Sequence, residues 1–247
     1  MKIQICSDLH IEHGSIIERN IKPSADILVI AGDINSGFLD QTLNKLSTMF
    51  KHVIAVMGNH DYYGHDINTR VDKVKETLNG NVHLLDGDVY ELQGYRFIGC
   101  NLWSDFIKGD YFFKSVARKS INDYNYIKKG GRSFTPDDAY DEYVLDQEFI
   151  RYSLFMSDDV SKNIVVTHSL PSSICTHPNF KDHRLNPYFI GNCDKILNDF
   201  EIPLWIFGHS HGSIDIKIND KTRLVSNCIG YPSERLPDYK ADFVIKI

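Results

Sequence analysis

The sequence has no long hydrophobic run, no cysteine-pair motif and no excess of basic residues. Its longest apolar runs, such as residues 27–31, have the length of a strand, whereas a membrane-spanning helix needs about 20 apolar residues. Five cysteines form an odd set without a C-x-x-C pair, which is typical of buried thiols rather than of a disulfide framework. A charged residue follows Met1 and no signal-peptide cleavage site comes after it, so we expect a cytoplasmic protein without a membrane segment.

The charge balance is slightly acidic, with 27 Lys and Arg residues, 33 Asp and Glu residues and a formal net charge of -6. No basic field is available to hold long duplex nucleic acid, so we expect no such partner. A small phosphorylated substrate is compatible with this balance, because bound metal ions add local positive charge that a count of residues does not include.

The chain does contain enough apolar residues for one large domain. Hydrophobic residues make up 42% of its 247 residues and charged residues 24%, which is the composition of an ordinary globular protein. We therefore predict a single domain over residues 1–247. A stretch rich in aromatic and charged residues predicts a cap-like insertion within it, over about residues 102–160, with the irregular part at residues 102–135.

Hydrophobic periodicity predicts strands that alternate with helices early in the chain and closely spaced strands near its end. The predicted strands are residues 2–7, 25–31, 52–57, 82–85, 89–92, 96–99, 164–167, 204–207, 214–218, 223–226 and 243–247. The predicted helices are residues 38–50, 67–78, 136–156 and 192–199. This order favours the α/β class, as a four-layer α-β-β-α sandwich of two mixed sheets flanked by helices, with a small helical or loop cap insertion.

Polar residues that can bind metal ions follow five of the predicted strands. In chain order the motifs are Asp8-Leu9-His10, Gly32-Asp33, Gly58-Asn59-His60-Asp61, Thr167-His168 and Gly208-His209-Ser210-His211. Each motif is weak alone, because an Asp after a strand more often caps a turn and a single His is usually structural. The carboxyl ends of strands in an open α/β sheet meet at one edge, so we expect all five motifs to converge there.

This ordered set of motifs resembles the calcineurin-like metallophosphoesterase superfamily, whose signature is D-x-H, G-D, G-N-H-[DE], H and G-H-x-H. The resemblance extends nearly from end to end and is strongest to small bacterial and phage members. It implies seven metal ligands: Asp8, His10 and His211 for one ion, Asn59, His168 and His209 for the second, and Asp33 as the bridge. Mixed oxygen and nitrogen ligands favour two divalent transition-metal ions, with Mn expected first and Fe, Zn, Co or Ni as alternatives.

A binuclear centre of this kind implies a mechanism. Two adjacent cations share a hydroxide, lower its pKa and hold two phosphoryl oxygens, so that the metal-bridging hydroxide attacks phosphorus in line. The resemblance further implies that His60 lies near the leaving-group oxygen as general acid or electrostatic partner and that Asp61 orients His60. A protonated imidazole helps poor leaving groups most, so His60 predicts activity on alkyl esters as well as on phenolic ones.

The motif details favour one enzyme subclass over another. After Gly32-Asp33 the sequence lacks the D-R-G that carries a phosphate-binding Arg in Ser/Thr protein phosphatases. Residues 58–61 resemble the phosphodiesterase and nuclease branches, although the chain is short for the nuclease and has no basic face. We therefore predict a phosphodiesterase acting on a nucleotide-type or other small phosphodiester substrate. The alternatives are a phosphomonoesterase or Ser/Thr-type protein phosphatase and, from another class, a non-catalytic metal-binding scaffold.

Candidate substrate-binding residues lie after the second motif and in the insertion. They are Asn35, Trp103, Asp105, Asn122 and Tyr124. Aromatic side chains at the mouth of the site would suit stacking on a nucleobase. The same aromatics also fit a second interpretation, in which they form the small core of the insertion. Residues 227–232 predict a tight turn near His211.

Overall fold

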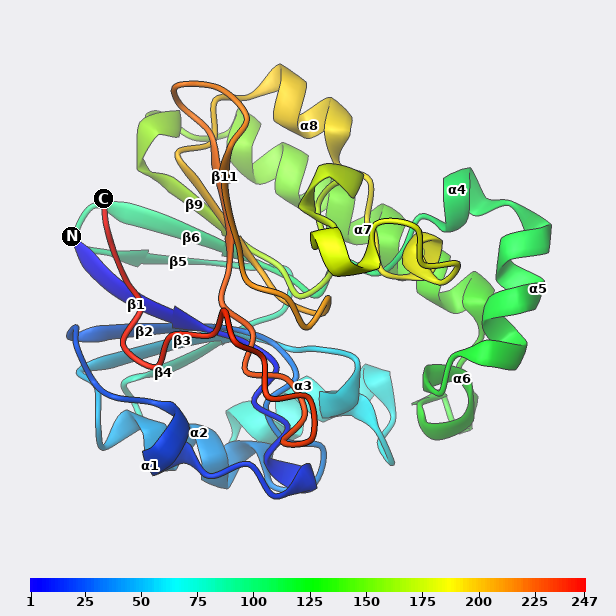
Figure 1. Ribbon diagram of the computed structural model, residues 1–247, viewed down its shortest axis with the longest axis horizontal. Coiled ribbons are helices and arrows are strands. Elements are labelled where there is room, and N and C mark those ends of the chain that lie inside the picture. The colour runs from blue at the N-terminus through cyan, green and yellow to red at the C-terminus, as the bar shows by residue number, and fades with distance from the viewer.

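Two mixed β-sheets lie face to face at the centre of the molecule, which a computed structural model describes over residues 1–247 (Figure 1). The helices on the outer side of the first sheet are α1 (Ile17–Asn20), α2 (Leu39–Ser47) and α3 (Ile67–Lys75). Those on the outer side of the second sheet are α7 (Pro136–Phe155) and α8 (Asp194–Asp199). The predicted fold class is confirmed, because two mixed sheets are flanked by helices on both sides.

The first sheet has the strand order β13-β1-β2-β3-β4. Its strands are β1 (Lys2–Cys6), β2 (Ile27–Ala31), β3 (His52–Val56), β4 (Val82–Leu85) and β13 (Val244–Lys246). β1 to β4 are parallel and β13 is antiparallel to β1. Every residue of β2 is buried, because helices cover one face of this sheet and the second sheet covers the other.

The second sheet has the strand order β11-β12-β10-β9-β6-β5. Its strands are β5 (Asp88–Leu92), β6 (Tyr95–Gly99), β9 (Asn163–Val166), β10 (Leu204–Phe207), β11 (Ile214–Lys217) and β12 (Arg223–Ser226). The four central strands are parallel and the two edge strands are antiparallel to their neighbours. All the predicted strands and helices are therefore present, with small shifts at their ends.

Buried aliphatic and aromatic side chains hold the two sheets together. A cluster of 15 buried residues fills the space between them, including Ile5 and Val29 from the first sheet and Phe97 and Ile206 from the second. A larger cluster of 43 buried residues joins the helices and the insertion to the outer faces. Burial of this apolar surface is the main term that stabilises the sandwich.

The segment between β6 and β9 projects from one end of the sandwich (Figure 1). It contains α4 (Phe106–Gly109), α5 (Tyr111–Ser120), α6 (Asp123–Tyr126) and a hairpin of β7 (Lys128–Lys129) and β8 (Arg132–Ser133). α7 follows, but it belongs to the helix layer, because Ile150 and Leu154 are buried in the core and the Ser153 carbonyl accepts a hydrogen bond from Arg96 of β6. We call residues 102–135 the cap.

Single turns of 3-10 helix complete the chain. They are η1 (Ile11–His13), η2 (His60–Tyr62), η3 (Val160–Lys162), η4 (Ser173–Cys175), η5 (Pro178–Phe180) and η6 (Asn186–Tyr188). The first two follow β1 and β3 directly, which is where the sequence motifs are. None of the helices combines the length and the apolar character that crossing a membrane requires.

A capping box starts α7 and makes a testable contribution to stability. The Thr135 hydroxyl accepts from the Asp138 backbone N–H, and the Asp138 carboxylate accepts from the Thr135 backbone N–H. Thr135→Ala removes the first of these bonds, so we expect the free energy of unfolding to fall by about 1 kcal/mol. Urea denaturation measures this change. Ser133→Ala is the control, since the exposed Ser133 side chain caps no helix, and an equal loss there would contradict the prediction.

Candidate metal centre

The loops that follow five strands bring polar side chains together at the end of the sandwich where the cap projects. They form three groups, and within each group the ligand atoms lie within 4.8 Å of one another. Six of the seven expected ligands make up the first group, Asp8, His10 and His211, and the second group, Asp33, His168 and His209. The third group is His10, Glu12, His13 and His60. The structure therefore brings the motifs into contact, as the sequence predicts.

The Asp33 carboxylate lies between the first and second groups. Its Oδ2 atom is 3.7 Å from Nε2 of His10, and its Oδ1 atom is 3.3 Å from Nε2 of His168. Gly58 leaves room for this carboxylate, because a Cβ atom at position 58 would collide with the Asp33 side chain and backbone. One carboxylate thus faces both groups, as a bridging ligand must.

In the first group two histidine nitrogens face each other. His10 Nε2 is 3.0 Å from His211 Nε2. The Nδ1 atom of His10 contacts Glu12 at 3.2 Å, and that of His211 contacts Glu234 at 2.7 Å. Carboxylates only accept hydrogen bonds, so each neutral ring carries its hydrogen on Nδ1 and directs an Nε2 lone pair at the other. Two lone pairs held this close repel unless a proton or a metal ion lies between them, so the two nitrogens are placed where they can hold a metal ion.

The second group has the same arrangement with different partners. His168 Nδ1 donates to the Ala31 carbonyl at 2.8 Å, which leaves a lone pair on Nε2. That Nε2 atom is 2.9 Å from Nδ1 of His209 and 3.1 Å from Oδ1 of Asn59. Asn59 is oriented in turn by Asp123, which accepts from its Nδ2 atom at 2.8 Å. Nitrogen and oxygen acceptors that converge in this way suit a divalent transition metal.

The backbone of the site is strained. Five of the seven expected ligands have positive φ angles although none is glycine: Asp8 at 55°, His10 at 45°, Asp33 at 52°, His209 at 70° and His211 at 45°. Such conformations cost on the order of 1–3 kcal/mol each and persist only where surrounding contacts hold them. Their concentration in one place indicates that the loops are shaped by the geometry of the site.

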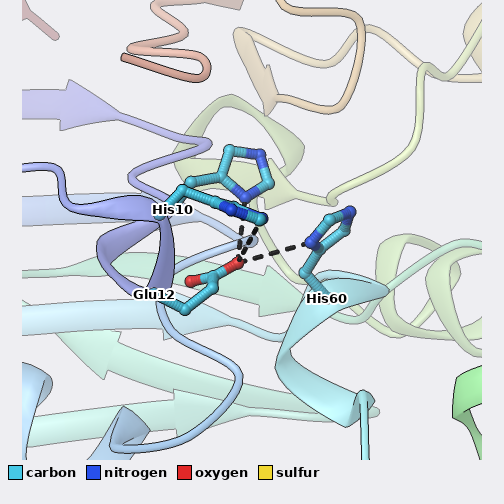
Figure 2. A group of neighbouring side chains, drawn as sticks. His10, Glu12 and His60 are labelled. Atoms are coloured by element: carbon cyan, nitrogen blue, oxygen red, sulfur yellow. Dashed lines mark hydrogen bonds and ion pairs between the residues drawn. The ribbon is translucent and has the colours of Figure 1, made fainter. Parts of the chain in front are cut away.

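His60 lies beside the first and second groups, and its ring contacts Glu12, Tyr231 and Tyr63 as well as the ring of His10. Glu12 Oε1 is 3.3 Å from His60 Nδ1, and the Tyr231 hydroxyl is 3.2 Å from Nε2. The ring of Tyr63 stacks on the imidazole, with centroids 4.3 Å apart. Figure 2 shows Glu12 between His60 and His10, with its carboxylate directed at both rings.

Asp61 has a different position from the one expected. Its fully buried carboxylate accepts from the backbone N–H groups of Ile34 and Asn35 at 2.9 Å and of Gly58 at 2.8 Å. It makes no hydrogen bond with His60, so the expectation that Asp61 orients His60 is corrected. Asp61 instead joins the loop after β2 to the loop after β3.

The charges around His60 favour its protonated form. Burial lowers the pKa of His60, but the carboxylates of Asp33 and Glu12 outweigh it and raise the pKa to about 9. Burial raises the pKa of Glu12, but hydrogen bonds from His10 and His60 bring it down to about 2. In the metal-free protein these carboxylates therefore favour the protonated imidazole.

Four of the five candidate substrate-binding residues line neither of the two large cavities at the metal-binding groups, although Trp103 and Tyr124 border a small pocket of about 10 Å³ beside Asn59 and His209. Trp103 and Tyr124 are 6% and 3% exposed and pack around Phe134, so they form the core of the cap. Asp105 accepts from two backbone N–H groups at the start of α4, and Asn35 makes a turn before α2. The assignment of these four residues to substrate binding is corrected. The two aromatic side chains pack in the core of the cap, and the two polar side chains bind backbone N–H groups. Asn122 does line the cavity described next.

A two-lobed cavity lies over the metal-binding groups. The first lobe, of about 340 Å³, reaches the second group and His211, and its far wall is apolar, with Phe180, Leu185, Phe189 and Ile190. The second lobe, of about 680 Å³, is lined by Glu12, His13, Ser36, Tyr126 and Ser233 among others.

The two lobes meet at four shared residues: His60, Tyr63, Asn122 and Tyr231. No Lys or Arg lines either lobe. The apolar wall of the first lobe comes from Phe180 in η5 and from Leu185, Phe189 and Ile190, which flank η6, a segment for which the sequence analysis predicts no element.

Two adjacent groups of metal-binding side chains that share a carboxylate, beside a protonated imidazole and an open cavity, define a metal-dependent hydrolase. The chain belongs to the calcineurin-like phosphoesterase family, whose model matches residues 1–213. It is a metal-dependent phosphoesterase, so the predicted superfamily and enzyme class are confirmed.

Individual relatives share less of the sequence. An uncharacterized protein of Acanthamoeba polyphaga mimivirus is 27% identical, over 94% of this chain and 92% of its own length. Among solved structures, a phosphopantetheinyl hydrolase from Mycobacterium tuberculosis is similar with a TM-score of 0.69 and 16% identity, over 94% of this chain and 90% of that chain. A dimetal phosphatase from Danio rerio is similar with a TM-score of 0.53 and 14% identity, over 92% of this chain and 86% of that chain. At these identities the two structures establish a shared fold.

Sequence reasoning missed four residues that contact the expected ligands or His60. They are Glu12, Asp123, Tyr231 and Glu234. A signal existed for Glu12, which is two residues beyond His10. Tyr231 lies within the turn predicted near His211, and Glu234 lies just beyond it. For Asp123 the only signal in the sequence was its position in the insertion.

Proposed function

We propose that this protein hydrolyses small phosphodiesters with two bound divalent transition-metal ions. The first group binds one ion, the second group together with Asn59 binds the other, and Asp33 bridges them. When bound, two such ions activate water and polarise the phosphoryl oxygens. Mn is the first metal to test, because the mixed carboxylate, amide and imidazole set accepts several transition metals.

The observation that carries this proposal is the cavity on both sides of His60. A phosphomonoester has one substituent on phosphorus and needs a single lobe, whereas a diester has two and can occupy both. A phosphate held at the metal-binding groups lies in the first lobe. A substituent that passes His60 enters the second lobe, where the imidazole can reach the leaving oxygen.

The lining of the lobes favours uncharged substituents. With no Lys or Arg along either lobe, a second phosphate on the substrate would find no side-chain cation. The apolar wall of the first lobe suits an aliphatic or amide chain. The second lobe presents Tyr63, Tyr126 and Tyr231, which suit an aromatic ring such as a nucleobase.

The chain's own residues have distinct roles in this proposal. His60 donates the proton held on Nε2 to the leaving oxygen. Tyr231, whose hydroxyl is 3.2 Å from that nitrogen, marks the position of the leaving oxygen. Tyr63 holds the imidazole in its plane through stacking and is itself fixed by its 2.7 Å hydrogen bond to Asp123.

The proposal predicts a preference for diesters. Protein stripped with a chelator and reloaded with Mn is assayed with bis(4-nitrophenyl) phosphate and with 4-nitrophenyl phosphate at matched concentrations. We expect a higher kcat/KM for the diester. A higher value for the monoester would identify a phosphomonoesterase, and inactivity on both after confirmed metal loading would favour a scaffold.

A substitution that fills the second lobe distinguishes the diester activity from the monoester activity. Ser233→Trp places a large side chain at the exposed edge of the second lobe, away from the metal-binding groups. We expect kcat/KM for the diester to fall at least about tenfold, with little change for the monoester. Thr69→Trp, on the exposed side of α3, is the matched control. Equal losses on both substrates would count against a diester that spans both lobes.

Two classes of natural substrate follow for the next screen. Cyclic and linear nucleotides would place the base in the second lobe. Phosphopantetheinyl esters are suggested by the name of the similar hydrolase and would place an uncharged chain in the first. We also propose a cytoplasmic location, which is consistent with five free and buried cysteines.

A further inference from the structure

Glu12 connects the expected metal centre to the expected general acid. Its Oε1 atom is 3.2 Å from Nδ1 of His10 and 3.3 Å from Nδ1 of His60 (Figure 2). The two rings come from different loops, since His10 follows β1 and His60 begins η2 after β3. They are close to each other, with centroids 4.6 Å apart. Glu12 is 16% exposed, so its contacts are largely shielded from water.

No other carboxylate makes a hydrogen bond with the His60 ring. Asp61 is committed to three backbone N–H groups, and Asp33 accepts from the His60 backbone rather than from its ring. The remaining polar contact of the ring is the Tyr231 hydroxyl on Nε2. Because Glu12 contacts Nδ1 of the His60 ring, Nε2 is the ring nitrogen that is free to face a substrate at the junction of the two lobes.

The same carboxylate orients His10. With Nδ1 of His10 directed at Glu12, Nε2 is directed at His211 and Asp33. A carboxylate in this position fixes the tautomer and ring plane of a metal-binding histidine. Glu234 has that role for His211 and accepts from the Tyr231 backbone N–H with the same oxygen, whereas Glu12 shares one oxygen between a metal-binding ring and His60.

We propose that Glu12 is a positioning residue that sets the orientation of His60 relative to the metal centre. This inference builds on the proposed function, because it concerns proton donation to the leaving group. Glu12 lines the second lobe, but it is His60 and not Glu12 that donates the proton to the leaving oxygen. Glu12 acts by holding His60 Nε2 towards the leaving oxygen while it holds His10 in its ligand position.

The kinetic test compares leaving groups at saturating Mn. The substrates are bis(4-nitrophenyl) phosphate, with a good leaving group, and diphenyl phosphate, with a poorer one. For Glu12→Ala we expect kcat on diphenyl phosphate to fall about 10- to 100-fold with little change in KM, and a much smaller fall on the nitrophenyl ester. Glu12→Gln keeps an acceptor oxygen and should recover part of the loss. Equal losses on both substrates would overturn the proposal.

A double-mutant cycle shows whether Glu12 acts through His60. In a His60→Ala background, adding Glu12→Ala should change kcat on diphenyl phosphate less than about threefold, because the group it positions is gone. Glu234→Gln is the matched control, since it supports His211 but does not contact His60. It should weaken metal binding without changing the ratio between the two substrates. Additive losses for Glu12 and His60 would overturn the proposal.

A second measurement needs neither metal nor substrate. Long-range proton–nitrogen spectra of the metal-free protein report on each histidine ring, and the signals of His60 are assigned by their loss in His60→Ala. We expect Glu12→Ala to shift the His60 Nδ1 signal and to broaden it through ring motion, and Glu234→Gln to leave it in place. An unchanged His60 signal in Glu12→Ala would overturn the proposal.

The proposed substrate class and the role of Glu12 can fail separately. If the wild-type chain hydrolyses only monoesters, the proposed substrate class is wrong, but the same comparison made with phenyl phosphate and 4-nitrophenyl phosphate still tests Glu12.

Discussion

Asp33→Asn is expected to lose at least about 1000-fold in kcat/KM for bis(4-nitrophenyl) phosphate. The side chain keeps its size, but one carboxylate oxygen becomes an NH2 group that cannot bind a cation. Asp33 is the residue whose two oxygens face both groups, at 3.7 Å from His10 and 3.3 Å from His168. The variant should therefore also bind less metal per chain, measured by atomic emission after gel filtration.

The control for Asp33→Asn is another Asp→Asn change. Asp26 is exposed and forms an ion pair with Lys51 at 2.8 Å, before β2 rather than after it. Asp26→Asn should retain wild-type turnover and metal content, because exposed ion pairs contribute little to stability. Normal turnover in Asp33→Asn would show that the ligand assignment is wrong.

His60→Ala is expected to change selectivity as well as rate. General acids contribute about 100- to 10,000-fold where the leaving group is poor. We expect a loss in that range on diphenyl phosphate and less than about tenfold on bis(4-nitrophenyl) phosphate, because nitrophenolate leaves without a proton. In the metal-free protein the nearby carboxylates of Asp33 and Glu12 raise the pKa of His60 to about 9 in spite of burial, which favours the protonated form.

A distant histidine provides the comparison for His60→Ala. His83 on β4 stacks on Tyr90 and lines neither lobe. His83→Ala should leave the ratio of the two kcat/KM values unchanged. If His60→Ala reduced both substrates by the same factor, a general-acid role would be untenable, and His60 would be left with a role in binding or in holding the Asp33 carboxylate.

The sandwich and the convergence of the motifs could be predicted because both follow from local patterns. Buried runs such as residues 27–31 have strand length and β-branched side chains, and each motif lies directly after such a run. In parallel strands of one sheet, residues at these positions meet at one edge whatever the connecting helices do. Asp8 and Asp33 therefore come together in the first sheet, and His168 reaches Asp33 from the end of β9 in the second sheet.

The surroundings of the ligands could not be predicted in the same way. Glu12 reaches His60 because η1 and η2 bend the loops after β1 and β3 towards each other, and 3-10 turns have no clear sequence period. Asp61 follows His60 in the sequence, and this adjacency suggests a contact between their side chains. In the structure the Asp61 carboxylate instead accepts hydrogen bonds from the backbone N–H groups of Ile34 and Gly58. Trp103 and Tyr124 were misassigned because an aromatic side chain in an insertion looks the same whether it faces ligand or core.

The strained backbone of the site sets activity and stability against each other. At each of the five ligand positions with a positive φ, Gly or Asn would adopt that backbone conformation at a lower cost in free energy. Exchanging His10 or His211 for such a residue would relieve backbone strain, but it would also remove the contact of the ring with Glu12 or Glu234. The positive φ angles of these histidines and aspartates therefore lower the stability of the fold, and the geometry of the metal-binding groups is the reason that this cost is retained.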